Sequence, residues 1–62
     1  MAGTIGIATE NLNPKGLIKV HGEIWKAVSL DNKTIKKGTA VKIISLEDLI
    51  LYVKQVENTD QE

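Results

Sequence analysis

Hydrophobic and polar residues alternate along two neighbouring segments of the chain, residues 17–21 and 23–29. Alternation with a period of two is typical of a β-strand that buries one face. The pair between the segments, His21-Gly22, fits a two-residue hairpin loop, because glycine suits the second position of primed turns and histidine adopts left-handed backbone more often than most residues. The pattern therefore predicts a β-hairpin. Its candidate inward-facing residues are Ile18, Val20, Trp25 and Ala27.

A short strand and a tight turn are predicted ahead of this hairpin. Residues 5–8 form the candidate strand, and a stretch rich in turn formers follows it. Pro14 fixes φ near about −65° and Gly16 accepts positive φ. We therefore expect Pro14-Lys15-Gly16 to form the turn that leads into the hairpin.

A polar connection and a further strand follow the hairpin. Residues 30–38 are mostly polar, with Ile35 as an isolated aliphatic residue, and we expect Ile35 to plug an end of the fold. Gly38 is expected to provide the bend into the next strand. The segment after it alternates again. One face of this segment carries Val41, Ile43 and Ser45, and the other carries Lys42, Ile44 and Leu46.

Residues 45–57 carry two conflicting patterns. Ser45 and Asp48 match a helix capping box, and four aliphatic residues recur at helical spacing. The alternative is a turn at Glu47-Asp48 followed by a strand, in which Asp48 takes a left-handed turn position. Residues 50–53 mostly favour β-structure, so the strand is preferred by a narrow margin. The helix would bury Leu46, Leu49, Ile50 and Val53, whereas the strand would bury Leu49, Leu51 and Val53.

Five short strands in meandering order predict an all-β fold, a small five-stranded closed barrel. Side chains fill the interior of a barrel this narrow, which leaves no room for a channel or a sizeable ligand. We expect the barrel domain to span residues 5–56, with a disordered start over residues 1–4 and a polar C-terminal tail over residues 57–62.

The composition of the chain argues against several classes of function. The chain has 62 residues, no cysteine and one histidine, which allows a single domain and excludes a disulfide framework or a Cys/His zinc site. Eight basic residues, all lysine, balance eight acidic ones. Nucleic-acid domains normally carry a clustered positive excess, and arginine supplies the fork that reads phosphates and bases. No run approaches the 18 apolar residues that would indicate a membrane span.

No catalytic constellation is visible, and no catalytic, cofactor-binding or metal-binding residue is predicted. His21 is interpreted as a turn residue rather than a base, and the carboxylates have no reason to converge. Trp25 is interpreted as a core residue, since a base-stacking platform needs several exposed aromatic side chains and the chain has one Trp, one Tyr and no Phe. The lysines between Lys33 and Lys42 form one positive cluster, so a nucleic-acid-binding barrel that uses the Lys33–Lys42 face is the alternative hypothesis.

Residues 12–27, LNPKGLIKVHGEIWKA, followed by residues 35–44, IKKGTAVKII, resemble the soluble C-terminal domain of the NfeD-like family. The shared pattern is Leu, Pro and Gly before a strand, then Gly-Glu-x-Trp-x-Ala, then Ile-x-x-Gly before a Val-rich strand. The resemblance covers roughly residues 3–55. The residues to which it gives a structural role are Pro14, Gly16, Gly22, Trp25, Gly38 and Asp48.

The resemblance implies a barrel similar to the OB-fold and a non-catalytic protein-interaction module. Such domains belong to membrane-anchored proteins with hydrophobic spans upstream, and longer members carry a separate ClpP-like serine protease domain. The implied partner is a stomatin, flotillin or prohibitin-type (SPFH) protein, with this domain in the aqueous phase, on the cytoplasmic side by preference. Self-association is a further expectation from the residues, if Ile24, Ile44 or Ile50 is exposed on this small barrel.

This sequence departs from the family pattern at two places. Asp48 stands where members commonly carry glycine before the last strand. Lys15, Lys19 and His21 stand in a hairpin region where members commonly carry Arg and Asp, so a partner contact that depends on arginine is not implied here.

Overall fold

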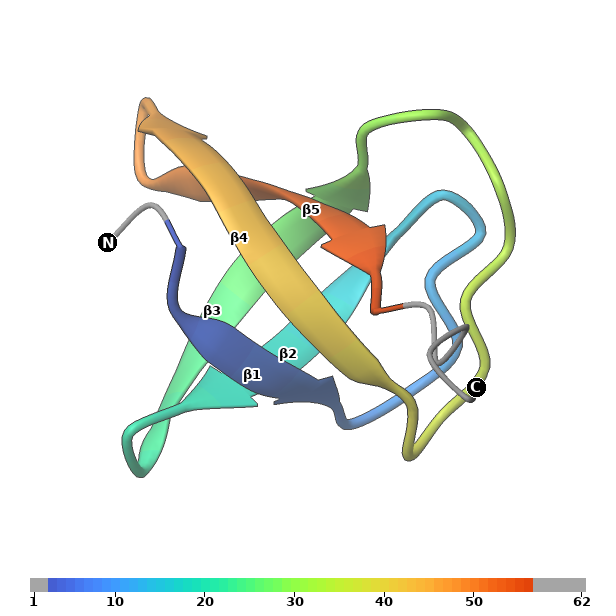
Figure 1. Ribbon diagram of the computed structural model, residues 1–62, viewed down its shortest axis with the longest axis horizontal. Helices are drawn as coiled ribbons and strands as arrows, with labels where there is room; N and C mark the ends of the chain where they lie inside the picture. The colour runs from blue at the N-terminus through green and yellow to red at the C-terminus, as the bar shows by residue number, and fades with distance from the viewer. Residues whose placement is uncertain (1–2, 57–62) are drawn as a thin grey trace, which may run out of the picture.

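The computed structural model describes residues 3–56, which form a closed barrel of five strands in the order β1-β2-β3-β5-β4 (Figure 1). The polar tail predicted for residues 57–62 lies outside the described residues. Within residues 3–56 there is no helix that could cross a membrane. The predicted five-stranded closed barrel is confirmed. The strands are β1 (Ile5–Ala8), β2 (Lys15–Val20), β3 (Glu23–Ser29), β4 (Ala40–Glu47) and β5 (Ile50–Gln55).

The strand order differs from the predicted meander. In a meander β4 would pair with β3, but β4 pairs antiparallel with β1, and β5 inserts between β3 and β4 as a parallel neighbour of β3. The long connection between β3 and β4 makes this possible, because it runs across one end of the barrel. Leu12 and Ile35 hold it there through two backbone hydrogen bonds of 2.7 and 2.9 Å. The resulting Greek-key closure is that of OB-type barrels.

The predicted hairpin at residues 17–29 is confirmed, with one change at its start. His21 and Gly22 both have positive φ, 51° and 81°, as the primed turn requires. The strand β2 begins at Lys15, however, so the predicted tight turn at residues 14–16 is not formed. Gly16 lies inside β2 and is not among the residues with positive φ. Pro14 follows a cis peptide bond and its carbonyl accepts the amide hydrogen of Ser29 at 2.8 Å.

The segment with the two conflicting patterns, from residue 45 onwards, forms a hairpin of β4 and β5, so the strand interpretation is confirmed and the helix is excluded. The turn lies one residue later than predicted, at Asp48 and Leu49, whose φ angles are 52° and 65°. Leu49, predicted to face inward, is consequently 76% exposed at the tip of the β4–β5 hairpin. Asp48 occupies the left-handed turn position, which asparagine and aspartate tolerate better than other side chains do.

A β-bulge overturns the predicted facing of residues in the second half of β4. Ile43 pairs with Val53 and Ser45 with Tyr52, so Ile44 is the extra residue. An extra residue reverses the alternation beyond it. Ser45 therefore shares the outer side with Tyr52 instead of lying on the same face as Val41 and Ile43, as the alternation predicted. Leu46 pairs with buried Leu51, yet is 43% exposed at the end of the barrel.

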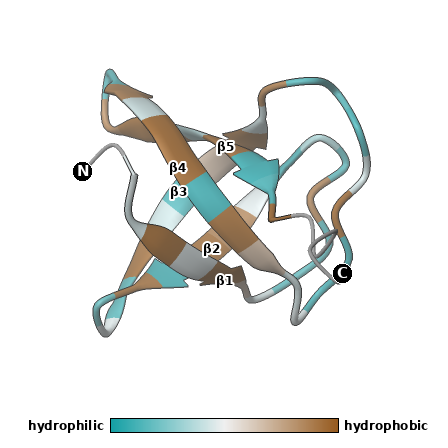
Figure 2. Ribbon diagram, in the orientation of Figure 1, coloured by the Kyte–Doolittle hydropathy of each residue, from teal (hydrophilic) through white to brown (hydrophobic). Residues whose placement is uncertain are grey.

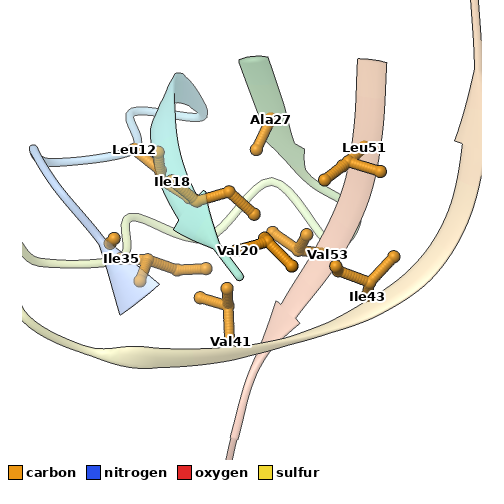
Figure 3. Close-up of a cluster of buried hydrophobic side chains, with 10 residues drawn as sticks. Leu12, Ile18, Val20, Ala27, Ile35, Val41, Ile43, Leu51 and Val53 are labelled. Atoms are coloured by element: carbon orange, nitrogen blue, oxygen red, sulfur yellow. The ribbon is translucent and has the colours of Figure 1, made fainter. Parts of the chain in front are cut away.

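Ten fully buried aliphatic residues fill the barrel (Figure 3). They come from all five strands, from the connection between β1 and β2, and from the connection between β3 and β4. Residues far apart in the sequence therefore fill the interior together. The core consists of Ala8, Leu12, Ile18, Val20, Ala27, Ile35, Val41, Ile43, Leu51 and Val53. Ile35 is 1% exposed, in agreement with the prediction that it plugs an end of the fold.

The barrel extends further towards the N-terminus than predicted. Gly3 donates its amide hydrogen to the carbonyl of Ile43 at 2.7 Å, and the amide of Ile43 donates to the carbonyl of Thr4 at 2.8 Å. Gly3 and Thr4, assigned from the sequence to a disordered start, therefore continue the pairing of β1 with β4.

Candidate interaction surface

Trp25 lies at the edge of the core rather than inside it. The ring packs against the buried cluster but is only half-buried. The register explains why: β3 first pairs with β5 at Lys26 and Ile50, so Trp25 stands on the part of β3 that β5 does not reach. Its Nε1 is enclosed by protein atoms and has no hydrogen-bond partner among residues 3–56. The indole nitrogen is thus turned into the protein, while part of the ring stays accessible at the edge of the core.

We expect Trp25→Ala to lower the free energy of unfolding by about 2–3 kcal/mol, less than the 3–5 kcal/mol typical of a fully buried ring. Trp25→Phe removes the unsatisfied donor while keeping an aromatic ring, and an unpaired buried donor costs about 1–3 kcal/mol. The phenylalanine variant is therefore expected to match or exceed the wild type in stability. Urea denaturation followed by circular dichroism compares the two. A phenylalanine variant as unstable as the alanine variant would contradict this account of the indole nitrogen.

The large hydrophobic side chains that are exposed among residues 3–56 are aliphatic. Three of them lie on β1 and β4: Ile5, Ile7 and Ile44 are 49%, 46% and 38% exposed. Val56 extends this surface, because its amide donates to the carbonyl of Ala40 on β4. Ala40 in turn pairs with Ile7. The other exposed large hydrophobic residues are Ile24, Leu30, Leu46 and Leu49.

A shallow groove crosses this outer face, and we call it the Lys42–Lys54 groove. It is lined by Ile5, Lys42, Ile44, Lys54, Gln55 and Val56, beside Gly3. In Figure 2 a hydrophilic band crosses β4 between hydrophobic stretches, and the end of β5 is hydrophilic beside it. No lining residue is acidic. The groove therefore combines apolar walls with positive charge, a pattern suited to a complementary protein surface.

The other residues singled out from the sequence do not assemble a chemical site. His21 is exposed at the tip of the β2–β3 hairpin. Within residues 3–56, no three side chains of the metal-ligating types come together. Gly22 and Gly38 have positive φ, 81° and 88°, and a Cβ on either would meet nothing within 4 Å, so both serve backbone turns. The positive cluster is divided between the loop carrying Lys33 and the outer face of β4 carrying Lys42.

Ser29 and Asp31 anchor the start of the β3–β4 connection. The hydroxyl of buried Ser29 donates to Oδ1 of Asp31 at 3.0 Å, and the backbone amide of Lys33 donates to the same oxygen at 3.4 Å. The Ser29 hydrogen bond, more than the contact with Lys33, holds the pKa of the Asp31 carboxyl below its usual 3.8. A carboxylate that accepts hydrogen bonds is stabilised in its charged form.

We expect this carboxylate to contribute to stability above the pKa it has in the unfolded chain and to lose that contribution as the pH falls through its lower folded value. Ser29→Ala preserves the size of the side chain but removes the donor. The pKa of Asp31 should then rise towards its usual value. An NMR titration between about pH 2 and 6 measures the pKa of the Asp31 carboxyl in the wild type and in Ser29→Ala. Identical titration curves would show that the Ser29 hydroxyl does not lower this pKa.

The outer-face aliphatic residues are the functional feature that sequence reasoning missed. The alternation rule assigns outward positions to solvent, so Ile5 and Ile7 carried no signal beyond their β-propensity, and Ile44 was noted only for self-association. The available signal was that Ile5, Ile7 and Ile44 are apolar at outward positions of strands whose inward positions are apolar as well. Strands apolar on both faces indicate a second contact surface.

A closed, side-chain-filled barrel with an apolar and basic outer groove defines a binding module that acts through its surface. Comparisons with known proteins agree with this class. Residues 1–55 match the family model described as NfeD-like C-terminal, partner-binding domain, and the chain belongs to this family. The domain is accordingly a protein-interaction module and not a catalytic one.

A solved structure and two curated proteins are among those similar to the chain. The structure is the C-terminal domain of stomatin operon partner protein 1510-C from Pyrococcus horikoshii, with a TM-score of 0.90, 45% identity, and coverage of 94% of this chain and 91% of that one. Membrane-bound protease PH1510 from Pyrococcus horikoshii is 49% identical over 53 residues, 86% of this chain. Uncharacterized protein MJ0826 from Methanocaldococcus jannaschii is 46% identical over 57 residues, 89% of this chain. The chain spans 12% and 40% of the lengths of these two proteins.

Proposed function

We propose that this domain binds a stomatin, flotillin or prohibitin-type (SPFH) protein and belongs to a membrane-anchored assembly, on the cytoplasmic side. The observation that carries the proposal is the outer face itself. The interior is sealed by ten buried side chains, while four large aliphatic residues, Ile5, Ile7, Ile44 and Val56, remain exposed around the groove. Contiguous exposed apolar surface on a small soluble domain marks an interaction site.

The similar structure belongs to a stomatin operon partner protein, and this supports the choice of partner class. The similar protease is a membrane-bound protein, and this supports the membrane setting. A barrel filled by buried side chains is suited to this role, because a packed interior holds the surface in place and little conformational freedom is lost on binding.

Isothermal titration of the folded domain with a stomatin-type protein tests the proposal. We expect a saturable complex with a dissociation constant of about 10 μM or tighter, the range of transient interfaces of modest size. A domain shown to be folded by circular dichroism that gives no heat of binding at tens of micromolar would contradict the choice of partner.

A further inference from the structure

We propose that the Lys42–Lys54 groove is the docking site for an acidic, apolar segment of a protein partner, in which one carboxylate is flanked by aliphatic side chains. This inference deepens the proposed function, on which its choice of a protein partner rests. It assigns the binding face and the chemistry of the segment that occupies it.

The two lysines of the groove face each other across adjacent strands. Lys42 on β4 pairs directly with Lys54 on β5, and Ile5 on β1 pairs with Lys42 on the other side. Directly opposed residues in an antiparallel pair have Cβ atoms about 5 Å apart, and like charges at this spacing destabilise a sheet. A single carboxylate placed between the two ammonium groups would convert that repulsion into two attractive contacts.

The surroundings supply no such carboxylate within residues 3–56. The lining of the groove is apolar or basic, apart from Gln55 and Gly3. The adjoining hollow, which shares Lys54 and Gln55, contains Asp31. The carboxylate of Asp31 already accepts hydrogen bonds from Ser29 and from the backbone of Lys33. Among residues 3–56, the groove therefore presents two lysines between aliphatic walls with no carboxylate in its lining.

The aliphatic side chains of the groove indicate which residues should flank the carboxylate of the docking segment. Ile5, Ile44 and Val56 are 49%, 38% and 38% exposed and border the lysine pair. Aliphatic side chains on either side of the carboxylate would cover them and exclude water, which strengthens the charge contact at the centre. The surface is hollowed rather than protruding, and this favours a protein segment over the flat face of a membrane.

The decisive variant is Lys42→Glu. It replaces a repulsive pair with an attractive one, so we expect it to fold with a melting temperature at or above that of the wild type. It also neutralises Lys54 internally and repels an acidic ligand. Lys26→Glu is the matched control, because Lys26 is an exposed outward lysine on β3 outside the groove and the change in net charge is the same.

The first measurement uses synthetic peptides and is independent of the identity of the partner. A 12-residue peptide that alternates leucine and glutamate is added to the isotope-labelled domain, with a leucine–lysine peptide as the control. We expect the acidic peptide to shift the methyl resonances of Ile5, Ile44 and Val56 in the wild type and in Lys26→Glu but not in Lys42→Glu. The basic peptide should shift none. Unshifted groove methyls with the acidic peptide would overturn the inference.

The second measurement titrates the stomatin-type protein with the same variants. We expect Lys42→Glu to weaken binding about tenfold or more and Lys26→Glu to change it by less than about twofold, with an affinity that falls as salt rises. Equal affinity of wild type and Lys42→Glu would overturn the inference while leaving the proposed function intact. A response to the acidic peptide without binding of the stomatin-type protein would support the groove and reject that partner. Sedimentation of the domain with phosphatidylglycerol vesicles, lost in Lys42→Glu, would assign the groove to a membrane surface and overturn the inference.

Discussion

Leu51→Ala is expected to lower the free energy of unfolding by about 3–4 kcal/mol, which is most of the 3–5 kcal/mol that a core of this size supplies. Leu51 is completely buried, and it lies beside Ala27 on β3 and opposite Leu46 on β4. Truncation would leave a cavity at the junction of three strands that the closed barrel cannot collapse around. Urea denaturation followed by circular dichroism measures the loss.

The matched control is the same substitution two residues earlier. Leu49 is 76% exposed in the turn, so Leu49→Ala should change stability by less than about 0.5 kcal/mol. Leu49→Gly should even stabilise the domain by about 1 kcal/mol, because the left-handed backbone at φ 65° strains any side chain with a Cβ. Equal losses for Leu49→Ala and Leu51→Ala would show that the β4–β5 turn is placed wrongly.

Gly16→Ala is expected to cost about 3 kcal/mol or more, at the upper end of the range for overpacked sites. A Cβ on Gly16 would lie 2.9 Å from the carbonyl oxygen of Asn11 and would overlap Cδ2 of Leu12. Leu12 cannot move aside, since it is completely buried and its backbone is hydrogen bonded in both directions to Ile35. Glycine is thus required here for close approach of two chain segments and not for a turn.

Gly22→Ala is the control for this prediction. Gly22 has φ 81° but open space around its Cα, so the cost is only the strain of a left-handed alanine, about 1–2 kcal/mol. Thermal unfolding of both variants makes the comparison. A Gly16 variant that melts within a few degrees of the wild type would mean that the segment around Leu12 is free to move.

Strand positions and the inward side of β2 and β3 followed from the sequence because alternation with a period of two is a local property. The same rule failed at three places where the cause is not local. The bulge at Ile44 reverses the facing of Ser45, and the pairing of β4 with β5 decides its position. The pairing of β4 with β5 also places the turn at Asp48 and Leu49, one residue later than the sequence predicted. The partial exposure of Trp25 depends on where β5 begins beside β3, which no feature of the β3 sequence encodes.

The candidate binding surface could be predicted from the sequence even less well than the fold. The pairing of Lys42 with Lys54 joins two strands whose register is set by the turn and the bulge between them. Ile5 joins the row only because β1 closes the barrel against β4. Each residue is unremarkable in its own segment, and the charge repulsion between apolar walls appears only when the three strands are assembled. The family resemblance led to the class of function, and the closed barrel supplies a candidate face for it.

If the barrel interior is inert packing and the domain acts through its outer face, a bound partner will perturb only outward side chains. Methyl-detected NMR of the domain during titration with a stomatin-type protein distinguishes the two sets of side chains. We predict that the outward methyls of Ile5, Ile7, Ile44 and Val56 shift while those of Val41, Ile43, Leu51 and Val53 stay in place. Shifts concentrated on the four interior residues, with the outer methyls unchanged, would contradict the account.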